Sequence, residues 1–543
     1  MKHLFTTILA IFLTSNLLAV NVWDGTSEPW TNGTGTETDP YLIETAANLA
    51  YLAEKVNEGY QAQGMAVFRY TYFLMTDDFD LDSINWTPIG NVNMNMEGYY
   101  FAGIFDGWYH NIDHLRIQSN ADVCGLFGGL GGEIEGNMHS NGMIMHLSVT
   151  NGSITSTGIG AAGIVGAMAD DAMVIQCSFS GNISVSNMGE YCGAGGIVAA
   201  AAEHARIVEC SYHGSITATN SNYMGAAGAG GIVGLAMDSV FISNCYNAGS
   251  INGNAMLLSV AAGILGTTLQ ENEVSVWNCY NVGTVTALNK GGIFGMISPI
   301  NPTKGETSLD VVNCFYLDTC GGITPYGTSK TSEEMQTEEF KNQLDQSIHA
   351  FVMDNGTNNG YPIHSLASYK LYEASEVTCY TAKLSADIHQ GNDNVAKAHF
   401  LYNVSDSTEM IEVEVPTDGY VEAVLEDLVP ETTYIYWFEL EFADGIVMAG
   451  GPHYFTTELN VGVESEEALK LVAYPNPATD IVHIQGVDAA EVQIFNALGQ
   501  LVRTVRGTNE VNISDLAQGH YLLRITSTKP DTVYVLPLSK QSH

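Results

Sequence analysis

The sequence predicts an all-β protein: a parallel β-helix solenoid with helical caps, followed by a β-sandwich and a small C-terminal β-sandwich. The first observation is a repeat, because five cysteines recur every 33–35 residues, each three positions after a Val or Ile: Cys177, Cys210, Cys245, Cys279 and Cys314. The second is a Gly-Ile-Val-Gly-like segment before each cysteine, with a Gly-x-Ile/Val step after the first four. A period of this length is typical of stacked supersecondary units.

The N-terminus, residues 1–19, resembles a secretory signal peptide. Lys2 precedes the apolar run from Leu4 to Leu13, and Ala19 is a small residue suited to cleavage. No later stretch is apolar and long enough to cross a bilayer as a helix. We therefore expect an exported chain with no transmembrane segment after processing.

An amphipathic helix is predicted next, as a cap on the first coil. Thr45 can cap its N-terminus, and Gly59 stands where a left-handed residue usually ends a helix. The apolar stripe between them can cover the open edge of a stacked sheet and consists of Ala46, Leu49, Leu52, Ala53 and Val56.

Each repeat offers three β-rich pieces, so we expect three strands per coil with glycines at the corners. A closing cap is predicted after the last coil. Thr331 and Glu334 form a capping-box pattern, and Phe340 and Leu344 share one face of the helix that follows.

The repeat cysteines are expected to form a buried column of free thiols. Equivalent side chains in stacked coils lie about 4.8 Å apart, whereas a disulfide needs Cβ atoms about 3.8 Å apart. Free cysteine packs as a small hydrophobe. No His or acid recurs beside the cysteines at metal-ligand spacing, which favours packing over redox or metal chemistry.

The repeat resembles the GLUG motif of right-handed β-helical regions in bacterial surface proteins. Gly125-Leu-Phe-Gly128 and its later Gly-Ile-Val-Gly relatives carry the resemblance, and Asp39-Pro-Tyr-Leu-Ile43 and Asn359-Gly-Tyr-Pro-Ile363 resemble the flanks of such regions. The resemblance covers residues 22–366. It implies an architecture and is not tied to one reaction.

Residues 370–457 resemble a fibronectin type III domain. Alternating apolar residues from Tyr434 to Phe442 have the period of a half-buried strand. Leu428-x-Pro430-x-x-x-Tyr434 resembles the tyrosine-corner approach of that family, and Tyr454-Phe-Thr-Thr457 resembles its final strand. Residues 458–468, rich in acidic side chains, are expected to be a linker.

Residues 469–543 resemble the C-terminal sorting domain of type IX secretion cargo. Three motifs carry the resemblance in order: Tyr474-Pro-Asn-Pro477, the segment from Val492 to Val502, and Leu516-x-x-Gly519-x-Tyr521. The resemblance implies handling by the type IX secretion machinery and a secreted, outer-membrane-surface or extracellular location. One more structural sandwich is the alternative interpretation.

Charge narrows the range of partners. Asp and Glu number 60 against 18 Lys and Arg, a formal net charge of −42. Attraction to nucleic acid or anionic lipid is thereby disfavoured, which leaves cations, neutral glycans or host and extracellular surfaces as partners. The sequence contains no zinc-protease, nucleophile-elbow or phosphate-loop motif, so we assign no catalytic and no cofactor-binding residue.

Acidic residues supply the candidate metal site. Asp170, Glu203 and Asp238 follow successive Gly-Ile-Val segments at one offset, with Gln270 next in the series, so stacked coils would align them at one corner. Such a corner is either a solvated acidic edge or a calcium site, with calcium the cofactor implied.

Two further sets of polar residues are candidates for a site. Asp78, Asp80 and Asp82 share a strand face and could be calcium ligands, an acid/base set or structural residues. His110 and His114 are expected to be satisfied structural or exposed histidines, because they follow a Phe-Asp-Gly turn in strand-rich sequence, where i, i+4 spacing does not place both on one helix face.

The tyrosines beside the repeat cysteines could stack on sugar rings, but a recurring aromatic residue more often packs on its own copy. They are Tyr212, Tyr246, Tyr280 and Tyr316.

The functional prediction is an exported, non-catalytic surface protein whose β-helix acts in adhesion or glycan binding. Two alternatives remain: a polysaccharide lyase or hydrolase on the same helix type, and a purely structural surface protein. An enzyme would need acids and a base that converge in a partly dry pocket.

Overall fold

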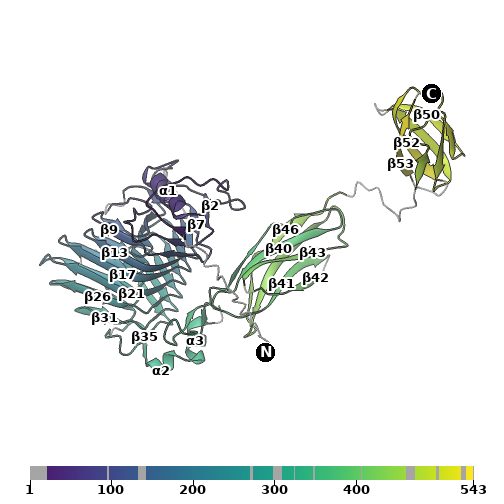
Figure 1. The fold of residues 1–543 in the computed structure, drawn as a ribbon. Helices are drawn as coiled ribbons and strands as arrows, with labels where there is room; N and C mark the ends of the chain where they lie inside the picture. Colours follow the sequence, from purple (N-terminus) through teal and green to yellow (C-terminus); the bar gives the residue numbers. More distant parts are fainter. Residues whose placement is uncertain are drawn as a thin grey trace, which may run out of the picture. The chain divides into compact units, whose positions relative to one another are not determined.

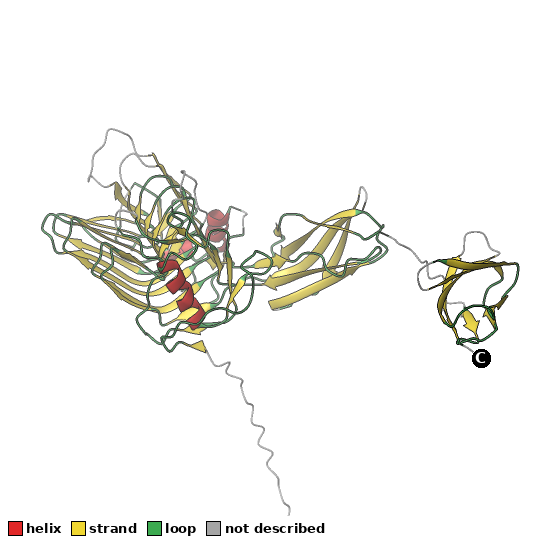
Figure 2. Ribbon diagram, turned by 90° about the horizontal axis from the view of Figure 1, so that it is seen from above, coloured by secondary structure: helices red, strands yellow, loops and turns green. Residues whose placement is uncertain are grey.

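The computed structural model describes residues 21–541 apart from short gaps, and the expected signal peptide and most of the expected linker lie outside the described residues. The gaps are 94–96, 133–141, 269–272, 298–307, 323–324, 347–348, 405–406, 417, 460–470, 497–499 and 528–532. Met1–Glu376, Ala382–Glu426 and Thr433–Phe455 form one compact unit, and Val377–Thr381, Asp427–Thr432 and Thr456–His543 form a second. Strands dominate both units (Figure 2).

The first unit contains a parallel β-solenoid built from four sheets (Figure 1). Sheet one has 13 strands: β1 Asn21–Val22, β5 Phe79–Asp80, β8 Asn111–Asp113, β9 Arg116–Ser119, β13 Ser148–Ser156, β17 Ser178–Asn187, β21 Ser211–Asn220, β25 Tyr246–Asn247, β26 Ser250–Ala255, β30 Tyr280–Asn281, β31 Val285–Thr286, β35 Phe315–Leu317 and β36 Thr328–Lys330. Sheet two has six: β10 Val123–Cys124, β14 Gly160–Ala162, β18 Tyr191–Gly195, β22 Ala226–Gly230, β27 Leu258–Ala262 and β32 Asn289–Gly291.

The other two sheets complete each coil. Sheet three has eight strands: β3 Ala66–Val67, β6 Tyr100–Phe101, β11 Phe127–Leu130, β15 Val165–Met168, β19 Val198–Ala201, β23 Val233–Ala236, β28 Leu265–Thr268 and β33 Phe294–Ile297. Sheet four has nine: β2 Tyr41–Ile43, β4 Tyr72–Met75, β7 Ile104–Asp106, β12 Met143–Met145, β16 Met173–Ile175, β20 Ala205–Val208, β24 Val240–Ser243, β29 Glu273–Trp277 and β34 Ser308–Val312.

The expectation of three strands per coil was wrong, because the regular coils have four. The Gly-Ile-Val-Gly segment is not one strand: its first two residues form the corner between sheets two and three, as between β14 and β15, and its last two begin the sheet-three strand. Its central residue points into the core and is 0% exposed in every copy: Ile164, Ile197, Ile232, Ile264 and Ile293. The glycine before it packs backbone against backbone, since a Cβ on Gly231 would lie 2.0 Å from the Gly263 carbonyl oxygen.

The predicted thiol column is confirmed. All nine cysteines are free and eight are buried, with Cys379 half-buried. The five repeat cysteines stack in order, and the amides of Cys210 and Cys245 each lie 3.4 Å from the sulfur of the next repeat cysteine. The column of β-branched residues three positions earlier is also in register, as in the pair Val174 and Ile207.

Helical caps lie at opposite ends of the solenoid (Figure 1). Helix α1, Ala46–Asn57, is capped by Thr45 and buries the predicted apolar stripe. The Thr331–Glu334 capping box is present, but it starts the one-turn helix α2, Ser332–Met335. Phe340 and Leu344 lie buried on a separate helix, α3, Glu338–Asp345. Both caps were predicted, and the division of the second into two helices was not.

A short hairpin and an antiparallel sandwich follow the second cap. The hairpin consists of β37 Phe351–Val352 and β38 Ile363–His364. One sandwich sheet has the order β39 Ser368–Leu371, β40 Ala382–His389 and β43 Asp418–Leu425. The other contains β42 Ser407–Val413, β41 Val395–Val404, β44 Thr433–Phe442, β45 Val447–Ala449 and β46 His453–Thr456. The alternation predicted from Tyr434 to Phe442 is the buried face of β44.

The second unit includes a small antiparallel β-module. One of its sheets has β47 Val472–Tyr474, β48 Ile481–Gln485 and β51 Glu510–Asn512. The other has β50 Leu501–Arg506, β49 Ala489–Asn496, β52 Gly519–Ser527 and β53 Val533–Lys540. Val482, Val492, Ile494 and Leu523 are fully buried between the strands and form the centre of its core.

Candidate functional site

A cavity of about 550 Å³ lies in the first unit at the corner where sheet four meets sheet one. Coil residues form one wall and include Tyr109, Gln176 and Glu209. The segment after α3 contributes His364, and the sandwich loop after β40 contributes Asn392. Three parts of the chain that are remote in sequence therefore enclose one space.

Part of the coil wall is formed by a column of residues with left-handed backbone, which we call the corner column. Its members occupy the same position in successive coils and have φ between 50° and 53°: His146, Gln176, Glu209, Asn244, Asn278 and Asn313. The last five stand directly before the repeat cysteines. This conformation costs an ordinary residue about 1–2 kcal/mol, and Asn tolerates it best.

The corner column departs from Asn where it lines the cavity. Asn244, Asn278 and Asn313 satisfy the backbone preference, and Asn313 Nδ2 donates to Asn278 Oδ1 at 2.9 Å. The three members that line the cavity are instead His146, Gln176 and Glu209. Longer polar side chains thus stand where the left-handed backbone favours Asn. Residues that conflict with the local backbone preference are expected at functional sites.

A hydrogen-bonded relay at this wall links side chains from three coils. The Tyr109 hydroxyl donates to Gln176 Oε1 at 2.7 Å, and Gln176 Nε2 donates to Glu209 Oε2 at 2.7 Å. Burial raises the pKa of Glu209 above its usual range, although the Gln176 hydrogen bond opposes the shift. The relay fixes the direction of the Glu209 carboxyl group beside the cavity.

The remaining walls present aromatic rings and neutral imidazoles. His389 stacks on Tyr109, with ring centroids 3.8 Å apart and planes 7° apart. Burial lowers the pKa of His364 to about 4, so its neutral ring donates from Nε2 to the Asn244 carbonyl oxygen at 2.7 Å. Burial also lowers the pKa of His213, whose ring meets Tyr246 edge to face.

The chemistry of the cavity suits a neutral polar ligand. Aromatic faces can stack on a sugar ring, and side-chain amides, hydroxyls and imidazoles can exchange hydrogen bonds with its hydroxyl groups. Glu209 is the single carboxyl group among the described lining residues, and Lys and Arg do not occur among them. Hydrolysis by a pair of carboxylates would require a second one.

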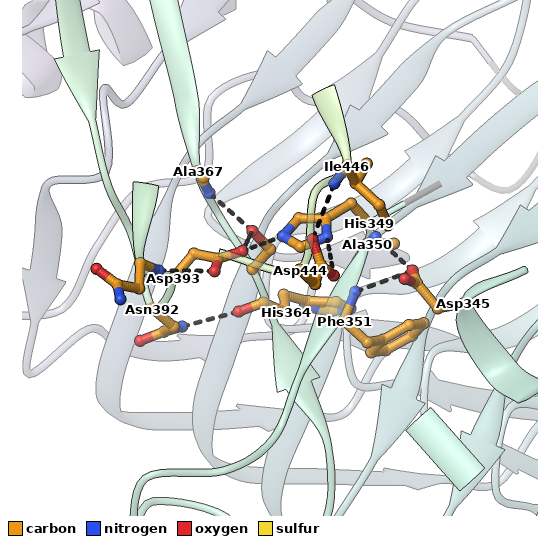
Figure 3. A network of polar contacts seen from close by, with 12 residues as sticks. Asp345, His349, Ala350, Phe351, His364, Ala367, Asn392, Asp393, Asp444 and Ile446 are labelled. Carbon is orange, nitrogen blue, oxygen red and sulfur yellow. Dashed lines mark hydrogen bonds and ion pairs between the residues drawn. The ribbon is translucent and has the colours of Figure 1, made fainter. Parts of the chain in front are cut away.

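A buried polar network holds the sandwich loop that forms one cavity wall (Figure 3). His349, 5% exposed, hydrogen-bonds through Nε2 to Asp393, and its Nδ1 lies 3.4 Å from Asp444 Oδ2. Its ring also stacks on Phe442, with centroids 3.8 Å apart. Ser365 Oγ donates to the same Asp393 carboxylate at 2.8 Å.

A second contact in this region joins the sandwich loop to the hairpin. Asn392 Nδ2 donates to the His364 carbonyl oxygen at 2.9 Å. Together with the Ser365–Asp393 hydrogen bond, this contact joins two consecutive residues of the loop to two consecutive residues at the end of the hairpin.

The structure places the three predicted acids at equivalent positions of one column, but they are not among the described groups of three ligand atoms that lie within 4.8 Å of one another. Met168, Ala201 and Ala236 are paired in register across successive coils. Each predicted acid stands two residues after one of them, so the three acids are aligned as well. Asp170 is buried, whereas Glu203 and Asp238 are exposed. Gln270 lies outside the described residues. A calcium site at this corner stays a prediction, and an unchanged thermal midpoint on calcium addition would contradict it.

Two of the three predicted aspartates near the first coils pair with the two predicted histidines. His110 Nδ1 lies 3.1 Å from Asp78 Oδ1, and His114 Nδ1 lies 2.9 Å from Asp80 Oδ1. In the sequence these aspartates and histidines form two separate sets. The signal was available, since each aspartate precedes its histidine by 32–34 residues, about one coil.

The repeat tyrosines pack on neighbouring coils, as the structural interpretation predicted. Tyr246 stacks on Tyr280 with centroids 5.1 Å apart, and Phe179 stacks on Tyr212 at 6.2 Å. Tyr212 and Tyr280 are 0% exposed, so neither can stack on a sugar.

Comparison with known proteins assigns the C-terminal module. Residues 472–535 match the secretion system C-terminal sorting domain. This domain marks the chain as a secreted or cell-surface protein handled by the type IX system. Among the described residues, no helix has the length and apolar character needed to cross a membrane.

Similarities elsewhere in the chain are weaker. A curated protein of Evansella cellulosilytica named "Putative Gly-rich membrane protein" is 32% identical over 154 residues, which are 27% of this chain and 15% of that protein. The chain thus spans a small part of this relative.

Solved structures add similarity without functional detail. One titled "a putative immunoglobulin A1 protease from Bacteroides ovatus" is 21% identical, covers 61% of this chain and 94% of its own, and has a TM-score of 0.45. A two-domain fibronectin type III segment of chicken tenascin is 21% identical, covers 32% of this chain and 99% of its own, and has a TM-score of 0.17. At these values neither similarity assigns an activity.

Proposed function

We propose that this secreted or surface protein binds neutral glycans without cleaving them, and that a sugar ring occupies the cavity beside the corner column. The observation that carries the proposal is the replacement of Asn by Gln176 and Glu209 where the column lines the cavity. A purely structural solenoid would gain from Asn at both positions. Ligand recognition gives a reason to keep the longer side chains.

The domain organisation is part of the same proposal. Residues 22–366 would be a GLUG-type β-helix, 370–457 a fibronectin type III-like domain and 469–543 the sorting domain. The pairing of β39, β40 and β43 in one sheet and of β42, β41, β44 and β45 in the other supports the middle assignment. In this arrangement the sandwich closes one wall of the site.

The test is a screen of the full mature chain on an array of neutral oligosaccharides, followed by calorimetric titration of any hit. We expect binding that Glu209→Asn and Gln176→Asn each weaken at least tenfold, because each change removes part of the relay. Asn278→Gln is the matched control, since it alters the same column away from the cavity and should leave affinity unchanged. A screen without binding, or hits indifferent to both cavity variants, would reject the proposal and favour a structural surface protein.

One observation favours the enzyme alternative. The raised pKa of Glu209 is a property of general acids, and neutral His213 also lines the cavity. A polysaccharide lyase or hydrolase would generate new chain ends. Incubation of array hits with the protein, followed by reducing-end assay and ultraviolet detection of unsaturated products, distinguishes this activity from binding alone.

A further inference from the structure

A second cluster of ligand-type side chains lies in the first coils of the solenoid and shares no residue with the cavity lining. Asp80, Asp113 and His114 each offer one ligand atom, and these atoms all lie within 4.8 Å of one another. His114 Nδ1 lies 2.9 Å from Asp80 Oδ1 and 3.3 Å from Asp113 Oδ2. The register of β5 and β8 stacks Asp80 directly on Asp113.

These separations suit a metal ion. Around tetrahedral zinc with bonds of about 2.0–2.1 Å, neighbouring ligand atoms lie roughly 3.3 Å apart. The distances from His114 Nδ1 to the two carboxylate oxygens, 2.9 and 3.3 Å, are close to that spacing, and the three ligand atoms all lie within 4.8 Å of one another. Movement of the side chains alone would admit an ion, with the register that stacks Asp80 on Asp113 kept.

The surroundings leave one Asp113 oxygen for the cluster. Asp113 Oδ1 accepts hydrogen bonds from Thr150 Oγ1 at 2.8 Å, Asn151 Nδ2 at 2.8 Å and the His114 amide at 3.0 Å. Its other oxygen, Oδ2, faces His114. Outer hydrogen bonds of this kind orient carboxylate ligands in metal sites.

The charges also favour a divalent cation. With the imidazole neutral, two carboxylates give the cluster a charge of −2. A divalent cation at this point would balance that charge and bind both carboxylates.

We propose that Asp80, Asp113 and His114 bind a zinc-type transition-metal ion, with water completing the coordination. The imidazole decides the class, because calcium and magnesium favour all-oxygen sites whereas zinc accepts mixed nitrogen and oxygen ligands. The neighbouring pair of His110 and Asp78 shows the contrast: its two atoms lie 3.1 Å apart, and it belongs to no described group of three ligand atoms.

The experiment uses chelator-treated full mature chain titrated with Zn²⁺ at pH 7, with Ca²⁺ in parallel. We expect one Zn²⁺ site that His114→Asn abolishes and Asp113→Asn weakens at least tenfold. Asn tolerates the left-handed backbone of His114, φ 52°, so the first variant keeps its fold. Co²⁺ should give the visible absorption of a tetrahedral site in the parent chain and not in His114→Asn.

His110→Asn is the matched control and should retain the Zn²⁺ site. Far-ultraviolet circular dichroism of each variant verifies that the solenoid is intact. The proposal would be overturned if the parent chain bound no Zn²⁺ or if the His114→Asn variant bound it equally well. The cluster would then be an ion pair of His114 with its aspartates and not a metal site. Calcium binding lost in the same variants would overturn the zinc assignment.

Discussion

At the scale of single residues, the backbone of the corner column and its side chains have different requirements. Left-handed φ angles favour Asn, and three of the six members are Asn. Glu209 is the member whose carboxyl group is also partly buried, so its backbone and its charge both cost folding free energy. A substitution of Glu209 therefore measures how much the candidate site lowers the free energy of unfolding.

We expect Glu209→Asn to stabilise the first unit by about 1 kcal/mol at pH 7, because it removes left-handed strain and a partly buried charge. A folded-state pKa above the unfolded value means that charged Glu209 destabilises the protein as pH rises through the unfolded pKa. The stabilisation by Glu209→Asn should become smaller below about pH 4, where the Glu209 carboxyl group is protonated in both the folded and the unfolded chain. Urea denaturation across pH measures it, and a loss of stability at pH 7 would show that the relay outweighs the strain.

Asn278→Gln tests the reverse substitution in the same column. It places a residue less suited to left-handed φ at a position with no cavity contact. We expect a loss of about 1 kcal/mol in the same denaturation experiment. Equal stability of parent and variant would contradict the cost assigned to the column.

At the scale of elements, the sequence predicted most of the solenoid from particular residues. The repeat cysteines and the Val or Ile residues before them fixed the stacking register, and Thr45 and Thr331 marked both caps. The fourth strand was missed because β14, β18 and β22 consist largely of Gly and Ala, which have weak strand propensity. These segments become strands because they pair in register with their copies in the neighbouring coils. No local sequence pattern reveals that pairing.

The cavity could not be predicted for a related reason. Tyr109 and His389 stack on each other but are 280 residues apart, and no repeat connects them. The corner column did leave a signal, since Asn precedes three repeat cysteines while Gln176 and Glu209 precede the other two. That departure was visible in the sequence, but its meaning required the φ angles.

Gly231→Ala tests the close packing of coil corners. The added Cβ would lie 2.0 Å from the Gly263 carbonyl oxygen, so adjacent coils must separate. We expect a loss of at least about 2 kcal/mol, measured by thermal unfolding. Gly451→Ala is the matched control, because its Cβ would meet no atom within 4 Å and should change stability by less than about 0.5 kcal/mol.

At the scale of the whole first unit, the His349 network makes the attachment of the sandwich loop dependent on pH. Burial alone would lower the pKa of His349, but the Asp393 hydrogen bond and the charges of Asp393, Asp444 and Asp345 together raise it. Burial likewise opposes the shift at Asp393, where the His349 hydrogen bond and others produce a lowered pKa. Protonated His349 and ionised Asp393 thus stabilise each other.

The sign of the pH dependence follows from these two shifts. The His349 contribution is complete below about pH 6.5 and is lost as pH rises through its higher folded pKa. The Asp393 contribution is present above about pH 3.9 and is lost as pH falls through its lower folded pKa. The contact should therefore be strongest between about pH 4 and 6.5.

We expect hydrogen exchange in residues 389–394 to speed up between pH 6 and 8 beyond the intrinsic chemical rate. His349→Asn, which suits the φ of 59° at this position, should exchange fast at both values. Segments of sheet three serve as the internal reference. Protection that does not vary with pH in the parent chain would contradict a role for His349 protonation.

Parallel stacking in a single register has a consequence for how such a protein can vary. Every interior coil packs against the next coil with the same kind of surface that the previous coil packs against it. Packing alone therefore does not set the number of coils. The caps, α1 at one end and the α2–α3 pair at the other, determine where the series of coils stops. Whole coils could be gained or lost between the ends while each remaining residue keeps neighbours of the same kind. Duplication of a single gene segment would then lengthen the molecule without redesign of its core.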